Sequence, residues 1–401
     1  MVPRVSFFRH LSNSWFDGRV EVFFDRDSLT MVEATIAGAQ CSIDMEMFMI
    51  GGEYGERILR LLDRKARNGV QVRLIHREGA SIRFGVLLKR LAHRITLRRR
   101  MNAERHYVPA TDRLFQTELK FSPIMRGHFP LGHFGPCPLS PLKLAHDKLI
   151  IVDGNIAIMG GLNLAAAVAD NHDLLIRISG PAVTAAAAIF TTDWSLTHPG
   201  EEGNSHGVSL DSISSAESGP DRLRFLVTRP GARKQLTAVL QLIDGACERL
   251  WIEMFYLTEP LIIQALSQAV IRGVNVRVIC DPNEYSLGLP MRGAPNLPFV
   301  SDMIAAGVPV RLFRALPGNQ MHQKSLLLDS EHVYTGATNF TRMSFLANTE
   351  SSVVIRSKHV AEIFERRFRE DWEEHSVLPD MNLIRRRRAY LGVVRLLSFL
   401  V

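Results

Sequence analysis

Residues 145–163 read AHDKLIIVDGNIAIMGGLN, and residues 321–339 read MHQKSLLLDSEHVYTGATN. Both segments fit one spaced pattern, H-x-K-x4-D-x6-G-x-x-N, in which polar residues flank apolar runs. One occurrence of such a pattern is a moderate signal, whereas two occurrences in one chain make coincidence a poor explanation. The matching residues are His146, Lys148, Asp153 and Asn163 in the first segment, and His322, Lys324, Asp329 and Asn339 in the second.

A second repeat lies upstream of each segment. Glu-Met-Phe occurs at residues 46–48 and 253–255, and Gly-Val-x-Val-Arg occurs at residues 69–73 and 273–277. With the apolar helical stretch between them, these sequences spell strand, helix, glycine stop and buried strand, which is the order of a βαβ unit. A chain of 401 residues can bury a core in each half. The sequence therefore predicts an α/β fold of two pseudo-symmetric lobes, each a mixed β-sheet flanked by helices.

The repeat also suggests domain boundaries. We expect a first lobe at residues 1–198, a linker rich in Ser, Gly and Glu at 199–220, a second lobe at 221–380 and a basic, apolar tail at 381–401. The first lobe carries an insertion at residues 101–143 that is rich in Pro, Gly, His and aromatic residues. Such a long irregular segment close to the chemistry is either a lid over the site or disordered.

Local rules place the polar residues of each segment around one small anion. The apolar runs 149–152 and 156–159, joined by Asp-Gly-Asn, predict a hairpin. Residues two apart on a strand face the same side, so the histidine and lysine of each segment point together. The glycines let the chain turn and bring the asparagine back to that side. Asp153 and Asp329 fall at the turn, where aspartate usually bonds backbone groups, and we expect a structural role for both.

These half-sites suit phosphodiester chemistry. Two lysines and two asparagines can neutralise the charge of a phosphodiester without a metal or other cofactor. One imidazole attacks phosphorus to form a phosphohistidine, while the other protonates the leaving alcohol and deprotonates the incoming water or alcohol. This scheme requires both histidines in one pocket, so the active site should lie at the lobe interface, across a pseudo-two-fold axis. A lone histidine beside an apolar strand is more often a core residue, but matched companions at both positions favour a site.

These residues resemble the phospholipase D superfamily, whose phospholipid enzymes carry the H-x-K-x4-D motif twice. The resemblance covers about Val20 to Trp372 and is strongest toward bacterial cardiolipin synthases. The shared features are the two Glu-Met-Phe sequences, Gly-Gly-Leu-Asn at 160–163, Gly-Pro-Ala-Val at 180–183, and Asp-Trp at 193–194 and 371–372.

The resemblance implies roles for matching positions. His146 is expected to be the nucleophile, and His322 the general acid and base. In this family an acidic residue after each motif orients the opposite histidine, and Asp173 and Glu350 stand at those places.

The chain departs from the family pattern in several places. Many members have serine where Gly161 and Ala337 stand, and cardiolipin synthases commonly carry arginine where Asp147 stands. The insertion at 101–143 has no match in that group, and the two-helix N-terminal membrane anchor of some members is not found. These departures bear on the substrate more than on the chemistry.

Composition limits the surroundings of the protein. The net charge of +7 suits a polyanionic surface, either an anionic membrane or nucleic acid. The four cysteines form no Cys-x-x-Cys pair, which argues against a zinc site and a disulfide framework, so we expect reduced and mostly interior thiols. The first twenty residues lack the apolar core of a signal peptide. We therefore expect a cytoplasmic protein that is peripheral on the cytoplasmic face of a membrane.

The C-terminal tail is a candidate for the membrane contact. Four arginines at 385–388 precede an apolar segment that is too short to span a bilayer. A basic cluster beside a short apolar segment suits an interfacial anchor on anionic lipid. The alternative is a terminal helix packed on the domain with a solvated arginine face.

Three functions are compatible with the sequence. The favoured one is a phosphatidyltransferase or phospholipase D acting on glycerophospholipids, with cardiolipin synthesis as the first case. The second is an endonuclease of the same superfamily, although those chains often have one motif and keep the serine, so we do not expect a nucleic-acid partner. The third, a binding scaffold with a dead site, predicts loss of a motif residue, and none is lost. Transfer versus hydrolysis, the headgroups and the oligomeric state stay open.

Overall fold

The first half of the chain forms a parallel βαβ unit followed by the hairpin of the first motif. The computed structural model describes residues 11–76, 114–129, 145–165, 170–198, 218–229, 234–286, 289–316 and 319–398. Strand β2 (Ser42–Met47) pairs in parallel with β4 (Gln71–His76), and α3 (Gly52–Arg67) connects them. The hairpin consists of β6 (Lys148–Val152) and β7 (Ile156–Gly160). The other elements are β1 (Phe16–Phe24), α2 (Asp25–Gly38), β3 (Ile50–Gly51), β5 (Met125–Gly127), β8 (Leu164–Ala165), β9 (Leu174–Ser179) and α6 (Ala182–Thr197).

The second half repeats this plan. Strands β11 (Arg249–Met254) and β12 (Asn275–Cys280) are parallel and joined by α8 (Pro260–Ile271), and β16 (Lys324–Leu328) and β17 (His332–Gly336) form the second hairpin. The other elements are β10 (Asp221–Thr228), α7 (Gln235–Gly245), β13 (Tyr285–Ser286), β14 (Leu289–Pro290), α9 (Leu297–Ala305), β15 (Val310–Phe313), α10 (Arg342–Leu346), β18 (Glu350–Arg356), α11 (Lys358–Glu373), β19 (Ser376–Val377), α12 (Met381–Arg386) and α13 (Arg388–Leu397).

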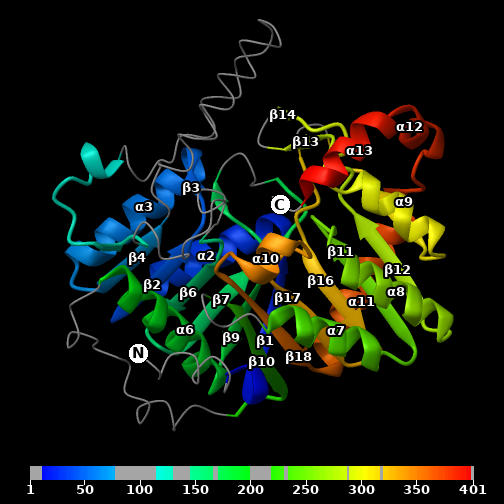
Figure 1. Cartoon of the computed structure of the whole chain (residues 1–401). Helices are drawn as coiled ribbons and strands as arrows, with labels where there is room; N and C mark the ends of the chain where they lie inside the picture. The colour runs from blue at the N-terminus through cyan, green and yellow to red at the C-terminus, as the bar shows by residue number, and fades with distance from the viewer. Residues whose placement is uncertain are drawn as a thin grey trace, which may run out of the picture.

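The two halves share one continuous mixed sheet (Figure 1). Its strand order is β19-β15-β12-β11-β16-β17-β18-β10-β1-β9-β7-β6-β2-β4-β5. This order reads as two matched halves on either side of β10 and β1, which pair antiparallel at Phe16↔Leu223, Asp17↔Arg222 and Gly18↔Asp221. The predicted pseudo-symmetric α/β architecture is confirmed, and the lobes are joined edge to edge rather than separated.

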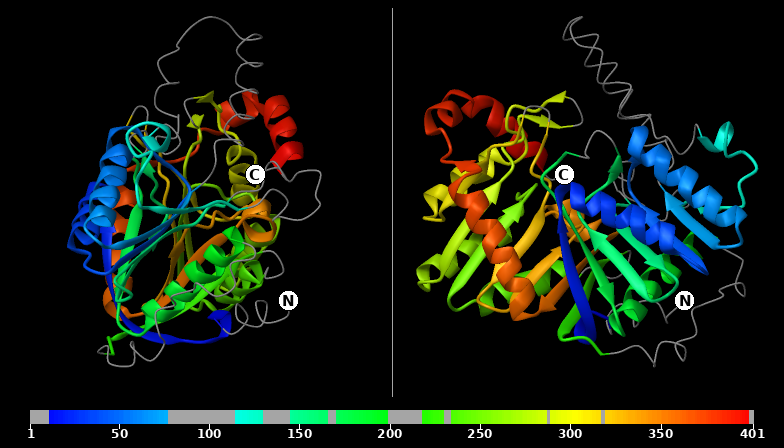
Figure 2. Two further views of the ribbon diagram at one scale, coloured as in Figure 1. Left: turned by 90° about the vertical axis from the view of Figure 1, so that its left-hand side faces the viewer. Right: turned by 180° about the vertical axis from the view of Figure 1, so that it is seen from behind.

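Helices cover both faces of this sheet. Figures 1 and 2 show α6 and α7 on one face, and α2 and α11 on the opposite face. Side chains of α6 and α11 pack with strands of both halves in a shared core, while α2 and α3 close a core of the first half and α7, α8 and α9 a core of the second. The shared core fixes the relative position of the halves, and hence of the two motifs, because it buries apolar surface from both.

Part of the insertion belongs to the fold. Within residues 114–129, Leu114, Phe115 and Leu119 are buried in the first-half core, and β5 extends the sheet beside β4. For this stretch the expectation of a lid or disorder is wrong, because its apolar side chains find a core to pack in. The rest of the insertion, and residues 199–217 of the predicted linker, lie outside the described residues.

The cysteines differ from expectation. Cys41 and Cys247 are exposed in the loops before β2 and β11, whereas Cys280 is buried, and all three are free thiols. The prediction that the cysteines are mostly interior was wrong. The backbone N–H groups of these two loops donate to the carboxylates of Asp153 and Asp329, so the loops are held by hydrogen bonds and not by apolar packing. Cys137 lies outside the described residues.

Helices α12 and α13 pack at the end of the second half. Ile384 and Leu391 are buried against Leu297 of α9. Across the described ranges, no helix combines the length and the apolar character required to cross a bilayer.

Candidate active site

Each motif histidine is paired with an acid from the other half of the chain. Nδ1 of His146 lies 2.8 Å from Oε2 of Glu350, and Nδ1 of His322 lies 2.6 Å from Oδ2 of Asp173. Backbone hydrogen bonds also join the two halves here, since the N–H of His146 donates to Thr349 O and the N–H of His322 donates to His172 O. The two motifs therefore meet at the junction of the halves, and each acid can fix the tautomer of the histidine opposite.

The lysines lie at the start of the motif strands. Strands β6 and β16 begin at Lys148 and Lys324, so the histidines two residues earlier lie just outside the hairpins, tied to the opposite half instead. Each ammonium turns back to the carbonyl of its own histidine, with Nζ–O distances of 2.6 Å for Lys148 and 2.5 Å for Lys324. Nζ of Lys324 also lies 3.1 Å from Nδ1 of His322, so the histidine and lysine side chains of the second motif lie together.

The phenylalanines of the repeated Glu-Met-Phe sequences line the same pocket. The ring of Phe48 lies 4.8 Å from the ring of His146 and 5.1 Å from the ammonium of Lys148. Phe255 repeats the arrangement, 4.6 Å from His322 and 5.2 Å from Lys324. An aromatic face attracts a buried cation and limits the movement of the imidazole. The repeat was visible in the sequence, but this role of its phenylalanines was not anticipated.

The two motif asparagines indicate that the pocket binds a ligand. Oδ1 of Asn163 and Oδ1 of Asn339 are buried without a hydrogen-bond partner among the described residues. The carbonyl and amino ends of such an amide are assigned from their bonding, so either end can face the pocket. Buried amide atoms usually find partners, and one unpartnered amide atom at each of two matched positions fits a group that bonds a phosphate oxygen.

The motif aspartates lie away from the chemistry. Asp153, at φ 52°, accepts the backbone N–H groups of Gln40, Cys41 and Ser42. Asp329, at φ 49°, accepts those of residues 247–249 in the same way. Each aspartate thus clamps the loop that leads into β2 or β11, which is a structural position.

Burial favours neutral forms of the pocket side chains. It lowers the pKa of Lys148 to about 8 and the pKa of Lys324 to about 7, with nearby carboxylates opposing both shifts. Burial and the ammonium of Lys324 lower the pKa of His322 to about 3. Burial also raises the pKa of Glu350 to about 7. An anion that enters the pocket counteracts the lysine and histidine shifts, so this site is built to gain positive charge when phosphate binds.

The affinity for a singly charged phosphodiester should fall as pH rises above about 7. Free Lys324, with a pKa of about 7, and then Lys148, with a pKa of about 8, lose the protons that the bound anion requires. Well above both values, the dissociation constant should rise about tenfold per pH unit for each proton lost. Calorimetric titration with dimethyl phosphate, whose charge is constant over this range, measures the effect. The variant Lys324→Arg should flatten the first part of the curve, and an affinity independent of pH would contradict the expectation.

The absence of the family serine has a steric cause at Gly161. A side chain placed there would bring its Cβ to 2.4 Å from Oδ1 of Asp173. Because Asp173 occupies that space to reach His322, the position accepts only glycine without a shift of the acid. Ala337, in the second half, is almost fully buried.

Asp147 is one of three buried carboxylates beneath the first motif. Its Oδ2 lies 2.5 Å from Nη2 of Arg229, which also lies 2.6 Å from Oδ2 of Asp193. Glu46 completes the group, and burial together with Asp193 and Asp147 raises its pKa well above the usual range. The guanidinium explains how aspartate replaces the arginine common at this position, since the cation is supplied by residue 229 instead.

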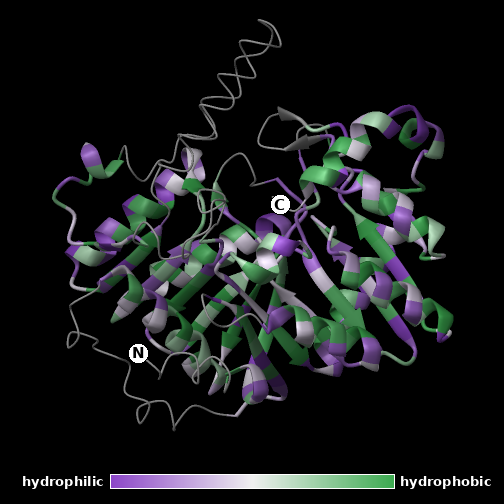
Figure 3. Cartoon of the chain, in the orientation of Figure 1, coloured by the Kyte–Doolittle hydropathy of each residue, from purple (hydrophilic) through white to green (hydrophobic). Residues whose placement is uncertain are grey.

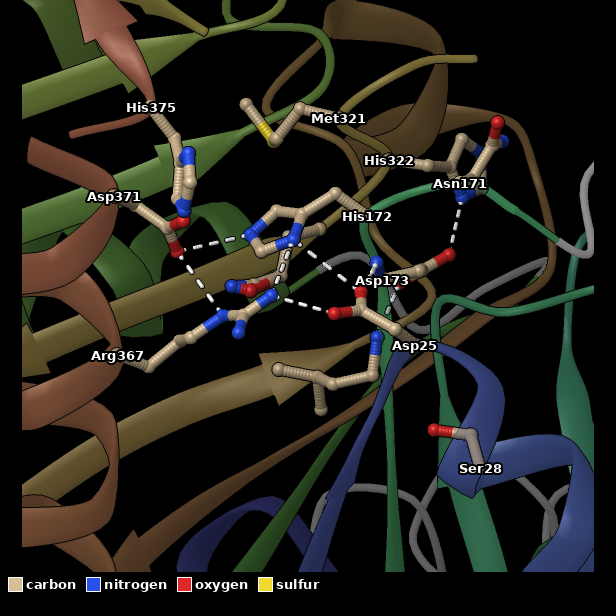
Figure 4. Close-up of polar contacts among 12 residues, drawn as sticks. Asp25, Ser28, Asn171, His172, Asp173, Met321, His322, Arg367, Asp371 and His375 are labelled. Carbon is tan, nitrogen blue, oxygen red and sulfur yellow. Dashed lines mark hydrogen bonds and ion pairs between the residues drawn. The ribbon is translucent and has the colours of Figure 1, made fainter. Parts of the chain in front are cut away.

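The second half has a related cluster with different residues (Figure 4). Glu253 accepts from Nε2 of Gln323 at 2.7 Å, and Asp371 lies 3.0 Å from Nε2 of His172. Nη2 of Arg367 lies 2.7 Å from Nδ1 of His172. Burial acts to lower the pKa of His172, but its hydrogen bonds to Asp25 and Asp371 outweigh burial and raise this pKa to about 10. The spacing of His172, Glu253 and Asp371, or of the first cluster, would admit a metal ion. Each cluster already has an arginine in contact with a carboxylate, Arg229 in the first cluster and Arg367 in the second. This positive charge makes the binding of a metal cation there unfavourable.

Comparison with known families decides the class of this site. The family described as "Cardiolipin synthase, PLD-like domain" matches residues 32–194 and 239–372, which contain both motifs and both paired acids. The chain belongs to this family. It is thus a phospholipase D superfamily enzyme of the cardiolipin synthase group, with the two repeated domains that its sequence predicted.

Individual cardiolipin synthases resemble this family member over much of its length. The enzyme of Listeria monocytogenes serotype 4a is 25% identical over 387 residues, which is 91% of this chain and 71% of the relative. Cardiolipin synthase A of Pseudomonas putida KT2440 is 27% identical over 249 residues, which is 57% of this chain and 47% of the relative. A solved structure, phosphatidylserine synthase of Haemophilus influenzae, shares the fold over 100% of both chains with a TM-score of 0.67 and 14% identity.

Proposed function

We propose that this enzyme transfers a phosphatidyl group from one glycerophospholipid to the hydroxyl of another and thereby forms cardiolipin. The observation that carries the proposal is the pair of histidine–acid contacts across the junction, at 2.8 Å and 2.6 Å. Two imidazoles from opposite halves of the chain in one pocket suit a double displacement, and the family relatives named above are cardiolipin synthases.

The first step is attack on the donor phosphate. With Nδ1 of His146 engaged by Glu350, Nε2 is the nitrogen that bonds to phosphorus, and the leaving alcohol takes its proton from His322. The two lysines and two asparagines surround the phosphate oxygens and stabilise the charge of the transition state. His322 has a pKa of about 3 in the empty pocket, so the bound phosphate anion must supply the attraction that protonates it.

The second step releases the phosphatidyl group. His322, now neutral, removes the proton of the incoming alcohol, whose oxygen attacks phosphorus and displaces Nε2 of His146. The products are a phosphodiester and the free imidazole, so atoms and charge balance without a cofactor. An alcohol acceptor gives transfer, whereas water gives phosphatidic acid.

Lipid extraction after incubation with labelled phosphatidylglycerol tests the proposal. Wild-type protein should form labelled cardiolipin and glycerol, and His146→Ala should form neither. Phosphatidic acid as the main product would replace transfer by hydrolysis. Cleavage of DNA by wild-type protein with unchanged lipid would overturn the proposal in favour of an endonuclease.

We further propose that α12 and α13 hold the enzyme on an anionic membrane surface. Helix α13 exposes Val393, Leu396 and Leu397, with 55%, 76% and 51% of their surface accessible, while Leu391 packs inward. The arginines at 385, 386 and 388 are exposed beside this apolar face, and Figure 3 shows hydrophobic residues on α13 next to α12, which carries residues of both kinds. Exposed apolar residues flanked by arginines match the chemistry of an anionic bilayer interface. The exposed free thiols of Cys41 and Cys247 fit the reducing cytoplasmic side.

Replacing the exposed residues of α13 should release the protein from vesicles. In the double variant Val393→Asp/Leu396→Asp, the partition coefficient to vesicles containing phosphatidylglycerol should fall by about 100-fold or more, since two apolar side chains no longer enter the interface. Sedimentation with vesicles measures this, and deletion of residues 385–401 should have at least the same effect. Ile271→Asp, which changes a residue 72% exposed on α8, is the matched control and should bind as wild type. Undiminished binding of the double variant and of the deletion would refute the membrane contact.

A further inference from the structure

Two residues that directly follow the paired central strands hold the acids that orient the histidines. Asp25 follows β1 and Arg229 follows β10, the two strands that pair at the junction. The N–H of Asp25 donates to Asp173 O at 2.8 Å, and the N–H of Asp173 donates back to Oδ1 of Asp25 at 3.1 Å. Nη1 of Arg229 donates to Glu350 O at 2.9 Å. Each residue is therefore hydrogen-bonded to the backbone of the acid in its own half.

The side chain of Arg229 also reaches into the opposite half. Its guanidinium donates to both carboxylate oxygens of Asp193 and lies 2.5 Å from Oδ2 of Asp147, the residue next to His146. Only 2% of Arg229 is exposed. A buried, multiply bonded arginine has one available geometry, so Glu350 and the chain around His146 are fixed to a common frame.

The side chain of Asp25, from the first half, contacts Arg367 of the second half (Figure 4). Its Oδ2 lies 2.5 Å from Nη2 of Arg367 on α11, and its Oδ1 lies 3.3 Å from Nδ1 of His172. The ring of His172 stacks on Phe313 of β15, with 4.5 Å between ring centres. Asp173 is thereby fixed to elements of the half that carries His322.

The two positions carry opposite charges because their surroundings do. The first half supplies three carboxylates beneath its motif, at residues 46, 147 and 193, and position 229 supplies the cation. The second half has Gln323 where the first has Asp147, and it contributes Arg367, so position 25 supplies the anion. Arg229 balances buried carboxylates that would otherwise be costly, and Asp25 balances the partly buried Arg367.

We infer that Arg229 and Asp25 are positioning residues, Arg229 for the Glu350–His146 pair and Asp25 for the Asp173–His322 pair. The inference rests on the proposed phosphohistidine mechanism and deepens it by assigning each network to one histidine. An acid displaced by a fraction of an ångström no longer fixes its imidazole, and misplacement of about 1 Å can cost about 100-fold in rate.

The decisive experiment reads each histidine separately. In protein labelled with ¹⁵N-histidine at pH 8, above the pKa of about 7 of Glu350, long-range proton–nitrogen spectra report the tautomers. Wild type should hold His146 and His322 in the Nδ1–H form, given the carboxylates at 2.8 Å and 2.6 Å. Arg229→Gln should mix the tautomers of His146 alone, and Asp25→Asn those of His322 alone. Hydrolysis of a chromogenic phosphodiester should fall about 100-fold in kcat with KM little changed in both variants.

Controls separate positioning from loss of structure. The matched exposed variants Arg356→Gln and Asp27→Asn should match wild type in spectra and rate. If Arg229→Gln does not fold, Asp147→Gln decides, because it removes one anchor of Arg229 and copies Gln323 of the second half; it should shift the tautomers of His146 in the same direction. Folded variants with wild-type tautomers would overturn the inference. The spectra need no lipid, so tautomer shifts in a protein that makes no cardiolipin would sink the proposed function and leave this inference standing.

Discussion

Replacing His322 with glutamine should convert the enzyme into one that stops at its covalent intermediate. With an activated phosphodiester whose leaving group needs no proton, His146 can still attack, but no base remains to activate the second alcohol. One equivalent of leaving group should appear in a burst and turnover should then stall. On natural phospholipid, whose leaving alcohol needs the acid, the rate should fall by about 10²–10⁴-fold. Stopped-flow release of the chromophore, with label retained on the protein in alkali and lost in acid, measures both effects.

The companion variants identify which histidine forms the bond. His146→Gln should show neither burst nor label, and the exposed His359→Gln should behave as wild type. A burst in His146→Gln with none in His322→Gln would exchange the two roles. Glu350 at 2.8 Å and Asp173 at 2.6 Å hold both rings alike, so the assignment rests on the family resemblance and this experiment is its direct test.

Replacing Asp153 with alanine should lower the free energy of unfolding by about 2–3 kcal/mol, without direct contact with the site. Three backbone N–H groups lose a charged acceptor, and alanine is strained at φ 52°. Asp153→Asn should lose less, because asparagine tolerates that backbone conformation and keeps one accepting oxygen. Urea unfolding measures the difference, with the exposed Asp170→Ala as control. A loss as large in the asparagine variant as in the alanine variant would contradict this account.

The same clamp predicts the pH dependence of stability. Burial acts to raise the pKa of Asp153, but the N–H groups of Ser42, Gln40 and Cys41 outweigh it, and the folded pKa is below the unfolded value. The stabilisation is therefore fully present above about pH 4 and is lost as pH falls through the lowered pKa. The difference between wild type and Asp153→Ala should shrink in acid.

The sequence predicted the site residues that occur in both halves of the chain and missed those that occur in only one half. Matched offsets of histidine, lysine and asparagine, found twice, were enough to place both half-sites in one pocket. The acids were harder to locate because Glu350 is 204 residues from His146, and the family resemblance supplied that link. Phe48 and Phe255 stood in a visible repeat, but alternation along a strand does not say which ring will contact an imidazole.

Arg229 and Asp25 had no sequence signal at all. Asp25 lies opposite Asp173, but Thr228 rather than Arg229 lies opposite Glu350, so the two residues are not equivalent in the repeat and a search for repeats passes over them. Their partners lie as far as 342 residues away, as for Asp25 and Arg367, and only the folded sheet brings them together. A charged residue at a repeated position inside an apolar strand, such as Glu46 or Glu253, is a signal that could have indicated charged networks beneath the motifs.

The edge-to-edge pairing of β1 and β10 has a consequence for how such a site can diversify. In a homodimer of a single repeat, every substitution would appear on both sides of the axis, and a cation at one position would meet a cation at its mate. One chain that carries both repeats is free of that constraint. Aspartate at 147 against glutamine at 323, and aspartate at 25 against threonine at 228, are choices open only to a fused pair. Fusion thus allows two nearly identical imidazoles to be assigned different duties in one reaction.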